Sequence, residues 1–212
     1  MKQKKIILIT ILLLMFSVTI FAQGITAKGF KGGLNIAKFT GSDADFGGEV
    51  DPKFAMGFAV GVFLTYSINN QMSIRPEILY SVKGTKYEED GVTLNFAMNY
   101  IDIPVLGVFS VQENISIFAG PYFGMFLGGK MKMEYNGDSA EEDIKKENTA
   151  NDFGLVFGGS YDIGNNLSIE ARYALGLKTF DKEPDDWDSS YGNYEEADIK
   201  NSALQIMVNY SF

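Results

Sequence analysis

The chain has 212 residues, with 18 basic and 27 acidic side chains, no cysteine and no histidine. The missing cysteines exclude disulfide bridges and thiolate metal sites. The acidic balance argues against nucleic acid as a partner, because phosphate binding needs a basic patch.

The first 22 residues have the order of a secretory signal peptide. Lys2, Lys4 and Lys5 precede an apolar run over residues 6–20, and Ala22 offers a small residue at a cleavage site. A membrane-spanning helix is the competing interpretation, but it needs about 20 apolar residues and a basic stop-transfer cluster. We therefore expect a signal peptide (1–22) and one mature domain (23–212). Its formal charge is −12, because 15 basic residues then remain against 27 acidic ones.

The mature chain alternates apolar residues with small or polar ones, which is the pattern of β-strands. The alternation is strictest over 54–68. At about 3.3 Å per residue this strand is roughly 50 Å long, which exceeds an apolar band about 25 Å tall even when the strand is tilted. In chain order we predict about eight strands, over 29–39, 54–68, 73–83, 92–109, 115–127, 153–163, 167–177 and 204–212.

One strand changes its pattern midway. In 92–109 the apolar set moves from the even positions 94, 96 and 98 to the odd positions 101, 103 and 105. This shift predicts a β-bulge near Asn99 and Tyr100. Pro76, Pro104 and Pro121 also lie inside strand patterns, which is unfavourable for central strands, but the flanking alternation outweighs them.

The predicted connections alternate in length. The short ones are 69–71, 112–114 and 164–166, and the longer, polar ones are 40–52, 84–91, 134–150 and 179–199. Outer-membrane barrels combine short periplasmic turns with longer extracellular loops. An even number of strands then places both ends of the chain in the periplasm.

The two faces of the strands show which side meets lipid. The apolar face is bulky and the opposite face is largely Gly, Ala and Ser, which suits the narrow interior of an eight-stranded barrel. A soluble lipocalin-like barrel would instead carry Lys and Glu outside. Tyr66, Tyr161 and Tyr210 lie near the short turns, as an interfacial aromatic girdle requires. We predict an all-β fold, a closed antiparallel transmembrane β-barrel in the outer membrane, with lipid around it.

The barrel must be closed, because the backbone groups of an open strand edge would find no hydrogen-bond partner in the lipid hydrocarbon. The chain ends on Phe212, with Tyr210 on the same face. This ending is similar to the signal that the barrel-assembly machinery reads during insertion. A last girdle residue is the simpler alternative, and both interpretations are compatible.

Four charged residues share the small, inward-facing parity: Arg75, Glu77, Glu170 and Arg172, with Lys31, Lys83, Asp102, Asp162 and Lys178 as candidate neighbours. Charges facing lipid cost a few kcal/mol, so we expect these side chains in the lumen, paired. They form either a plug or a selectivity filter, and the narrow lumen favours the plug. Replacing Arg75 or Arg172 with alanine should cost about 3–5 kcal/mol each.

The predicted long loops are acidic. The first carries Asp43, Asp45, Glu49 and Asp51, the third Glu141, Glu142, Asp143 and Glu147, and the fourth eight acidic residues with Trp187 and Tyr191. Such oxygen-rich loops can bind Ca²⁺ weakly. Since no segment has an EF-hand spacing, we expect no specific metal site and no cofactor.

Several motifs resemble the PorT-like outer-membrane β-barrel family of Gram-negative bacteria. They are residues 29–35 (GFKGGLN), 75–80 (RPEILY), 100–106 (YIDIPVL), 119–123 (AGPYF), 154–159 (GLVFGG) and 171–173 (ARY). The likeness covers the mature chain and implies the barrel fold. Some members of that family take part in protein secretion, and none supplies a catalytic residue to carry over.

We expect no enzyme, because small outer-membrane hydrolases and acyltransferases rely on a histidine that this chain lacks. The expected function is that of a structural or adhesion element, or of a component of a secretion or envelope assembly with its own partner proteins. The alternative is a narrow passive pore for small solutes.

Overall fold

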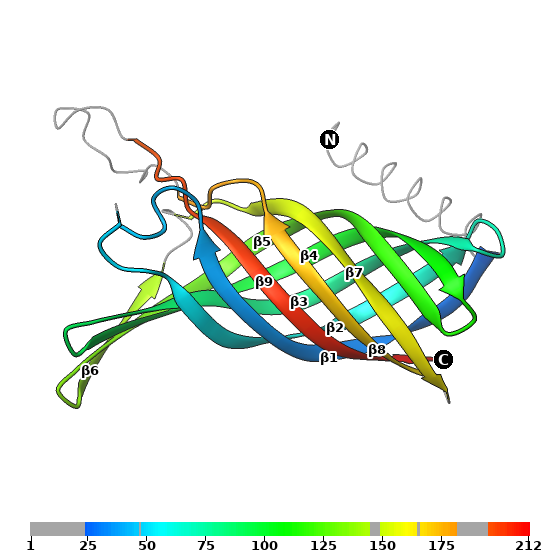
Figure 1. The fold of residues 1–212 in the computed structure, drawn as a ribbon, viewed down its shortest axis with the longest axis horizontal. Coiled ribbons are helices and arrows are strands. Elements are labelled where there is room, and N and C mark those ends of the chain that lie inside the picture. The colour runs from blue at the N-terminus through cyan, green and yellow to red at the C-terminus, as the bar shows by residue number, and fades with distance from the viewer. Residues whose placement is uncertain (1–23, 47, 145–148, 165, 182–194) are drawn as a thin grey trace, which may run out of the picture.

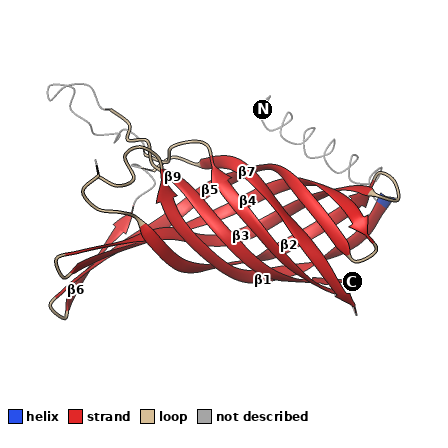
Figure 2. Ribbon diagram, viewed as in Figure 1, coloured by secondary structure: helices blue, strands red, loops and turns tan. Residues whose placement is uncertain are grey.

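The computed structural model describes residues 24–46, 48–144, 149–164, 166–181 and 195–212. The expected signal peptide and its cleavage site lie outside these residues. Nine strands make up the described fold (Figures 1 and 2). They are β1 (Ile25–Thr40), β2 (Lys53–Ser67), β3 (Met72–Glu89), β4 (Val92–Gln112), β5 (Ile115–Tyr135), β6 (Asp138–Ile144), β7 (Asp152–Gly164), β8 (Leu167–Gly176) and β9 (Lys200–Ser211).

Eight of these strands close into a ring. Every neighbouring pair is antiparallel, in the order β1–β2–β3–β4–β5–β7–β8–β9, and β9 pairs with β1. The ninth strand, β6, pairs with the end of β5 and extends the wall beyond the barrel. The predicted closed barrel of about eight strands is therefore confirmed. Among the described residues, no helix is long and apolar enough to cross a membrane.

The two ends of the barrel differ in their connections. The links after β2, β4 and β7 are short and lie at the same end as the C-terminus (Figure 1). At the opposite end, two of the four predicted long loops are instead hairpins. Asp90 and Gly91 form one turn and Asn136 and Gly137 the other, all with positive φ angles between 46° and 92°. Such residues favour the two-residue turns that match strand twist. The prediction of long loops over 84–91 and 134–150 was therefore wrong where strands and two-residue turns take their place.

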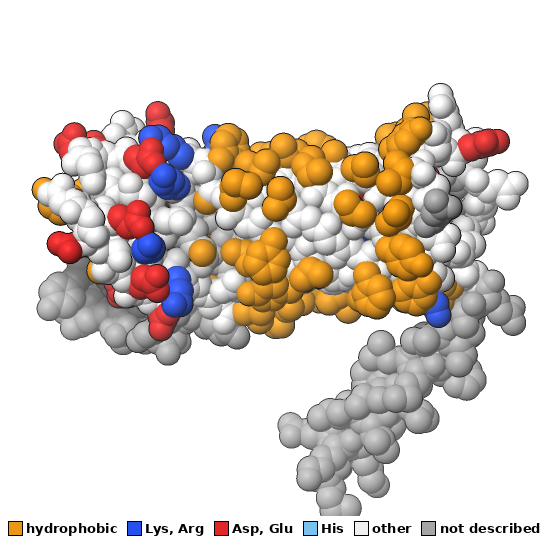
Figure 3. Space-filling model, turned by 90° about the horizontal axis from the view of Figure 1, so that it is seen from below, with side chains coloured by type: hydrophobic (Ala, Val, Ile, Leu, Met, Phe, Trp, Pro, Cys, Tyr) orange, Lys and Arg blue, Asp and Glu red, His pale blue; other side chains and the backbone are white. Residues whose placement is uncertain are grey.

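The outer surface has one broad apolar zone. Outward side chains such as Phe58, Val62, Ile78, Val105 and Phe157 are each between 43% and 54% exposed. Figure 3 shows apolar side chains along the barrel wall and charged ones gathered at the end with the hairpins. This face is the one that the sequence assigned to lipid.

The strand irregularity lies where the sequence placed it, but on the other strand. Asn99 pairs with Gly128 and Tyr100 with Phe126, so the extra residue is Leu127 of β5. The phase of β4 does not change, because Met98, Tyr100 and Asp102 all point inward and are at most 5% exposed. The shift of its apolar residues reflects a change in what surrounds the strand.

Candidate functional site in the barrel lumen

Five charged side chains meet inside the barrel near its middle. Lys31 Nζ donates to Glu77 Oε1 at 2.7 Å and to Glu170 Oε1 at 3.0 Å. Arg172 Nη1 donates to Glu77 Oε2 at 2.6 Å and lies 3.3 Å from Glu170 Oε1. Both carboxylates are therefore shared between the same two cations. Because a second cluster lies nearer the hairpin end, we call this one the lower cluster; its members are Lys31, Arg75, Glu77, Glu170 and Arg172.

The lower cluster bridges the lumen. Glu77 lies on β3 and Arg172 on β8, four places apart in a ring of eight, which puts the two strands on opposite walls. A direct bond between them means that side chains fill the barrel at this level. Gly158 on β7 makes room for the arginine, because a Cβ there would lie 2.6 Å from Arg172 Cβ.

Arg75 belongs to the lower cluster more loosely than Arg172. Its Nε lies 3.5 Å from Glu77 Oε1, and its Nη1 lies 3.7 Å from Glu170 Oε2. Its Nε and Nη2 are buried without a hydrogen-bond partner among the described residues. The guanidinium instead lies 4.9 Å from the ring centre of Phe118 and 6.0 Å from that of Phe63, distances typical of cation–π contacts.

A second polar group, the upper cluster, lies nearer the hairpin end. Lys83 Nζ donates to Asp102 Oδ1 at 2.9 Å and to Asp152 Oδ2 at 3.1 Å, and the Tyr122 hydroxyl donates to Asp152 at 2.9 Å. Asn201 Nδ2 on β9 donates to the Tyr100 hydroxyl on β4 at 3.1 Å. These two strands are also four places apart in the ring, so this level is bridged as well.

Amide side chains continue the network along the barrel. Arg172 Nε donates to Gln205 Oε1 at 2.6 Å, and Gln205 Nε2 donates to Asn35 Oδ1 at 2.6 Å. Asn35 then donates to Ser81 Oγ at 2.9 Å. Buried polar groups are stable only when partners satisfy them, and here most partners come from neighbouring lumen side chains.

The charges of the two clusters balance each other, but they do not balance within each cluster. The lower cluster holds three cations and two carboxylates, and the upper cluster holds one cation and two carboxylates. With every group ionised, the formal charges are +1 and −1. The pair of clusters is neutral as a whole, which suits a barrel interior closed off from water.

The structure brings together the four lumen residues singled out by sequence, together with Lys31. Lys83 and Asp102 lie in the upper cluster, at a different level. Asp162 and Lys178, expected as neighbours, are exposed at opposite ends of the fold. Asp162 still lies within electrostatic reach of Arg75, so the expectation was wrong for Lys178 only. Both lie just beyond the part of their strands that lines the lumen.

Four lumen residues escaped the sequence analysis as parts of the site: Tyr100, Tyr122, Asp152 and Asn201. Asp152 directly precedes a predicted strand and has the parity of its lumen-facing positions, so a one-residue extension of that strand would have found it. Tyr100 was misplaced because the bulge was assigned to its own strand. Tyr122 and Asn201 carry no charge to mark them.

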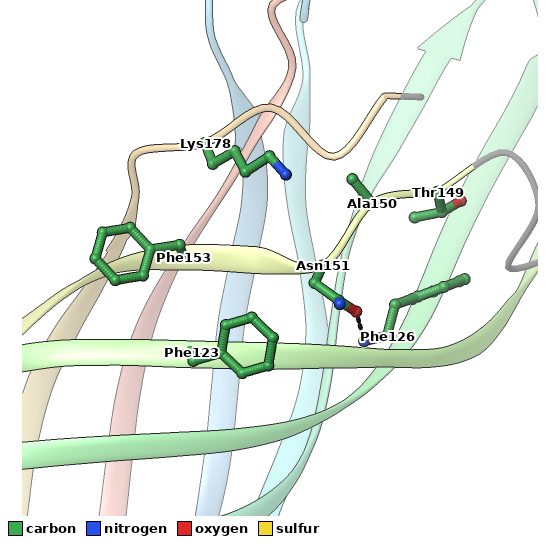
Figure 4. A pocket seen from close by; sticks show the side chains of 7 residues that line it. All are labelled: Phe123, Phe126, Thr149, Ala150, Asn151, Phe153 and Lys178. Atoms are coloured by element: carbon green, nitrogen blue, oxygen red, sulfur yellow. Dashed lines mark hydrogen bonds between the residues drawn. The ribbon is translucent and has the colours of Figure 1, made fainter. Parts of the chain in front are cut away.

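A notch opens in the outer wall between β5 and β7 (Figure 4). Its volume is about 440 Å³, and its lining includes Phe123, Phe153 and Lys178. Here β6 has ended and β7 has not begun, so no strand lies beside the Phe126 amide on the side away from β4. Asn151 Oδ1 accepts that N–H at 3.1 Å. The side chain thus satisfies a backbone donor that no neighbouring strand accepts.

The C-terminal aromatic residues lie on the outer surface at the short-turn end. Tyr210 and Phe212 are 48% and 57% exposed. The Phe212 ring centre lies 5.4 Å from that of Phe30, and the Phe212 amide donates to Lys28 O at 2.9 Å. This position fits a girdle residue and leaves the side chains accessible from outside the barrel.

The acidic loops are only partly described, since residues 145–148 and 182–194 are not. Asp43 Oδ2 accepts the Asp198 amide at 2.6 Å, and the Asp198 carboxylate pairs with Lys200. No group of three or more acidic side chains within the described ranges is arranged to hold a metal ion.

A closed antiparallel ring with an apolar outer face and an ion-paired interior defines a transmembrane β-barrel protein. A family model described as "Outer membrane protein beta-barrel domain" matches residues 21–182. The chain belongs to this family, and its location is the outer membrane. By the arrangement common to such barrels, the short-turn end is periplasmic and the hairpin end extracellular.

The chain is similar in structure to several solved outer-membrane proteins. Ail, the attachment invasion locus protein of Yersinia pestis, is 17% identical with a TM-score of 0.46, over 88% of this chain and 98% of that one. Neisserial surface protein A is 14% identical with a TM-score of 0.47, over 87% and 97% of the two chains. The N-terminal barrel domain of Pseudomonas aeruginosa OprF is 7% identical with a TM-score of 0.40, over 88% and 100%. No curated protein matches the sequence significantly.

Proposed function

We propose that this protein is a non-enzymatic, plugged barrel that acts through its surfaces and not by conducting solutes. It serves as a structural or adhesion element, or as a component of a secretion or envelope assembly of the kind found among PorT-like proteins. The absence of histidine from the sequence supports the non-enzymatic part, because a common catalytic base is missing.

The cross-lumen bond between Arg172 and Glu77 carries the plug proposal. The bond is 2.6 Å long, and both side chains are at most 1% exposed. The Asn201–Tyr100 bond closes the upper level in the same way. A solute would have to break both bridges, and separating a buried ion pair costs several kcal/mol.

Conductance of the purified barrel in planar bilayers tests this proposal. The folded protein should be silent, while a porin in the same bilayers serves as the positive control. The charge-neutral double variant Glu77→Ala with Arg172→Ala removes one bridge and should admit water and small ions more readily. Steady open channels in the unaltered protein would contradict the plug and favour the narrow passive pore.

Three further parts of this proposal have their own tests. Hydrolysis by the purified barrel that disappears on substitution of one serine or carboxylate would contradict a non-enzymatic role. Cross-linking in intact envelopes should capture partner proteins of an assembly. A bound Ca²⁺ at the acidic loops would be detected by calorimetric titration, and we expect weak binding at most.

A further inference from the structure

The extracellular end carries a sheet with two unlike faces. The ends of β3, β4 and β5, together with β6, extend past the lipid zone (Figure 1). The outward face is charged, with Lys86, Glu88, Lys130, Lys132 and Glu134. The other face is apolar over β4 and β5, where Leu94 pairs with Met133 and Phe96 with Met131, and β6 adds Glu142 opposite Met131. Met133 and Tyr135 remain 44% and 52% exposed on it. Here water, not lipid, meets those apolar side chains.

This apolar face forms one wall of a groove. The groove has a volume of about 470 Å³, and Phe46, Val50, Tyr87, Val92 and Leu94 provide its apolar lining. A deeper cavity of about 230 Å³ shares Phe46 and Tyr87 with the groove and continues among Phe39, Phe96, Met98 and Phe180. Concave, mostly apolar sites of this combined size are typical of ligand pockets.

Phe46 is held over the groove in an unusual conformation. Its φ angle is +53°, in the left-handed region that bulky residues rarely adopt, and its side chain is 51% exposed. Its ring lies 4.9 Å from the Tyr87 ring, and the Tyr87 hydroxyl donates to Ala44 O at 2.7 Å. Strained residues of this kind cluster at binding sites. The loop therefore presents an aromatic side chain to solvent at a conformational cost.

The rim of the groove is negative. Glu49, Glu89 and Asp90 border it, and within the described part of the chain none of the three forms an ion pair. On the outward face, by contrast, Glu88 pairs with Lys53 and Lys86. A ligand for the groove must therefore combine apolar groups for its floor with positive charge for its rim.

We propose that this groove binds a short cationic peptide segment that carries large apolar side chains. The apolar side chains enter the space beside Phe46 and Tyr87, and lysine or arginine side chains meet Glu49, Glu89 and Asp90. The inference rests on the proposed function, since a plugged barrel acts through its exposed end. An anionic lipid is disfavoured by the same rim charges.

The test uses the full mature barrel in zwitterionic detergent and an amidated, fluorescent probe peptide of Lys, Leu and Phe. Phe46→Ser should weaken binding about tenfold, the loss expected for one buried aromatic contact. Glu89→Gln with Asp90→Asn should weaken it about threefold to tenfold. Binding of the unaltered protein should also weaken at about 1 M NaCl, where the Debye length is about 3 Å.

Matched controls separate this site from general attraction. Glu134→Gln removes one charge from the opposite face of the same sheet and should leave the affinity unchanged. A probe with glutamate in place of lysine, and a lysine probe with serine in place of Leu and Phe, should both bind poorly. Equal weakening by Glu134→Gln, or equal binding of the glutamate probe, would overturn the proposal.

Other occupants give distinct results. Binding that appears only after residues 182–194 are replaced by a Gly-Ser linker would assign the groove to the chain itself. A dimer that Phe46→Ser dissolves would assign it to a second copy. Either result overturns the proposal. A barrel that is silent in bilayers yet binds no probe refutes this inference alone, whereas a conducting barrel refutes the proposed function whether or not it binds the probe.

Discussion

The two halves of β4 belong to one continuous strand, yet they place their apolar side chains on opposite faces. In the lipid zone the outward positions are Ile101, Ile103 and Val105, and the inward ones include Asp102. Beyond lipid, the inward positions are Leu94, Phe96 and Met98, while Thr93 and Asn95 point outward. The backbone phase is constant, so the change comes from the medium outside the wall.

The comparison explains why the barrel has two kinds of interior. In the lipid zone most large apolar side chains lie on the outer face, and the lumen holds the bridging ion pairs and amides beside a smaller apolar cluster of Leu106, Phe118, Tyr122, Val156 and Ala174. Beyond lipid the outer face meets water, and the interior becomes an aromatic core around Phe39, Tyr87 and Phe126. The same period of two therefore places the apolar side chains on the outer face within the lipid zone and on the inner face beyond it, as in soluble β-sheets.

The largest expected effect lies in the lower cluster. Arg172→Ala should lower the free energy of unfolding by about 3–5 kcal/mol, because Glu77 and Gln205 each lose a buried 2.6 Å hydrogen bond from this arginine. Arg75→Ala should cost only about 1 kcal/mol, since Arg75 lies 3.5 Å and 3.7 Å from the two carboxylates and two of its nitrogens have no hydrogen-bond partner among the described residues. Sequence alone predicted equal costs. Denaturant unfolding in detergent measures both, and equal losses would contradict the unequal pairing.

The change of apolar face along β4 can be tested by placing a lysine at two outward positions of the strand, one in the lipid zone and one beyond it. Val105→Lys places a cation on the lipid face near the middle of the wall and should cost about 2–4 kcal/mol. Thr93→Lys lies on the same face beyond lipid, opposite Glu88 and Glu134, and should change stability by about 0.5 kcal/mol or less. Refolding into lipid vesicles, followed by denaturant titration, measures the difference. Similar costs at both positions would place Thr93 within the bilayer.

The periplasmic end of the lipid zone is marked by Phe212. Deleting this residue removes one outward aromatic side chain, worth about 1.5–3 kcal/mol of apolar burial in lipid. If the barrel-assembly machinery also reads it, the amount of assembled barrel in cells should fall more than refolding into detergent does. Val111→Ala, a truncation at another outward position, is the control. Equal, mild losses in both settings would make Phe212 a girdle residue only.

The boundary on the extracellular side is tested at the notch. Asn151→Ala leaves the Phe126 amide without an acceptor and should cost about 1–2 kcal/mol in lipid. Asn151→Asp keeps an acceptor oxygen and should retain most of the stability. Denaturant titration in vesicles measures both variants. If alanine and aspartate behave alike, then water reaches the amide and the lipid zone ends below Phe126.

The wall of the barrel was predictable from sequence because lipid demands an apolar residue at every second outward position. The strand positions and faces followed from that demand, as for 54–68, which β2 matches within one residue at each end. The strands of the two hairpins were missed because their apolar side chains face inward, whereas those of the lipid-facing wall face outward. Their turns carried the signal nonetheless, as Asp90-Gly91 and Asn136-Gly137 are typical of two-residue turns.

The pairing of side chains within the lumen was harder to predict from sequence. Parity shows which side chains point inward, but not which of them meet, because the height of each strand depends on register around the whole ring. Lys31 thus lay among several candidates, although it binds both Glu77 and Glu170. The groove was beyond sequence reasoning, since its walls come from a loop near residue 46 and from a hairpin about 40 residues further along.

The smallest expected effect concerns the tyrosine that joins the groove to the aromatic core. Burial, with a contribution from Asp45, raises the pKa of Tyr87 from 10.0 to about 12. Tyr87→Phe removes the hydrogen bond to Ala44 O and should cost about 0.5–1.5 kcal/mol at neutral pH. Tyr135→Phe, at an exposed tyrosine on the same sheet face, should cost almost nothing and is the control.

The pH dependence of that cost separates burial from hydrogen bonding. Because folding raises the pKa of Tyr87, its neutral form contributes stability that is full below pH 10 and is lost as pH rises through about 12. The advantage of the unaltered protein over Tyr87→Phe should therefore be constant up to about pH 10 and shrink above it. Unfolding titrations at several pH values measure this difference. An advantage that stays constant through pH 12 would mean that folding does not raise the pKa of Tyr87, and that solvent reaches the phenol in the folded protein as it does in the unfolded chain.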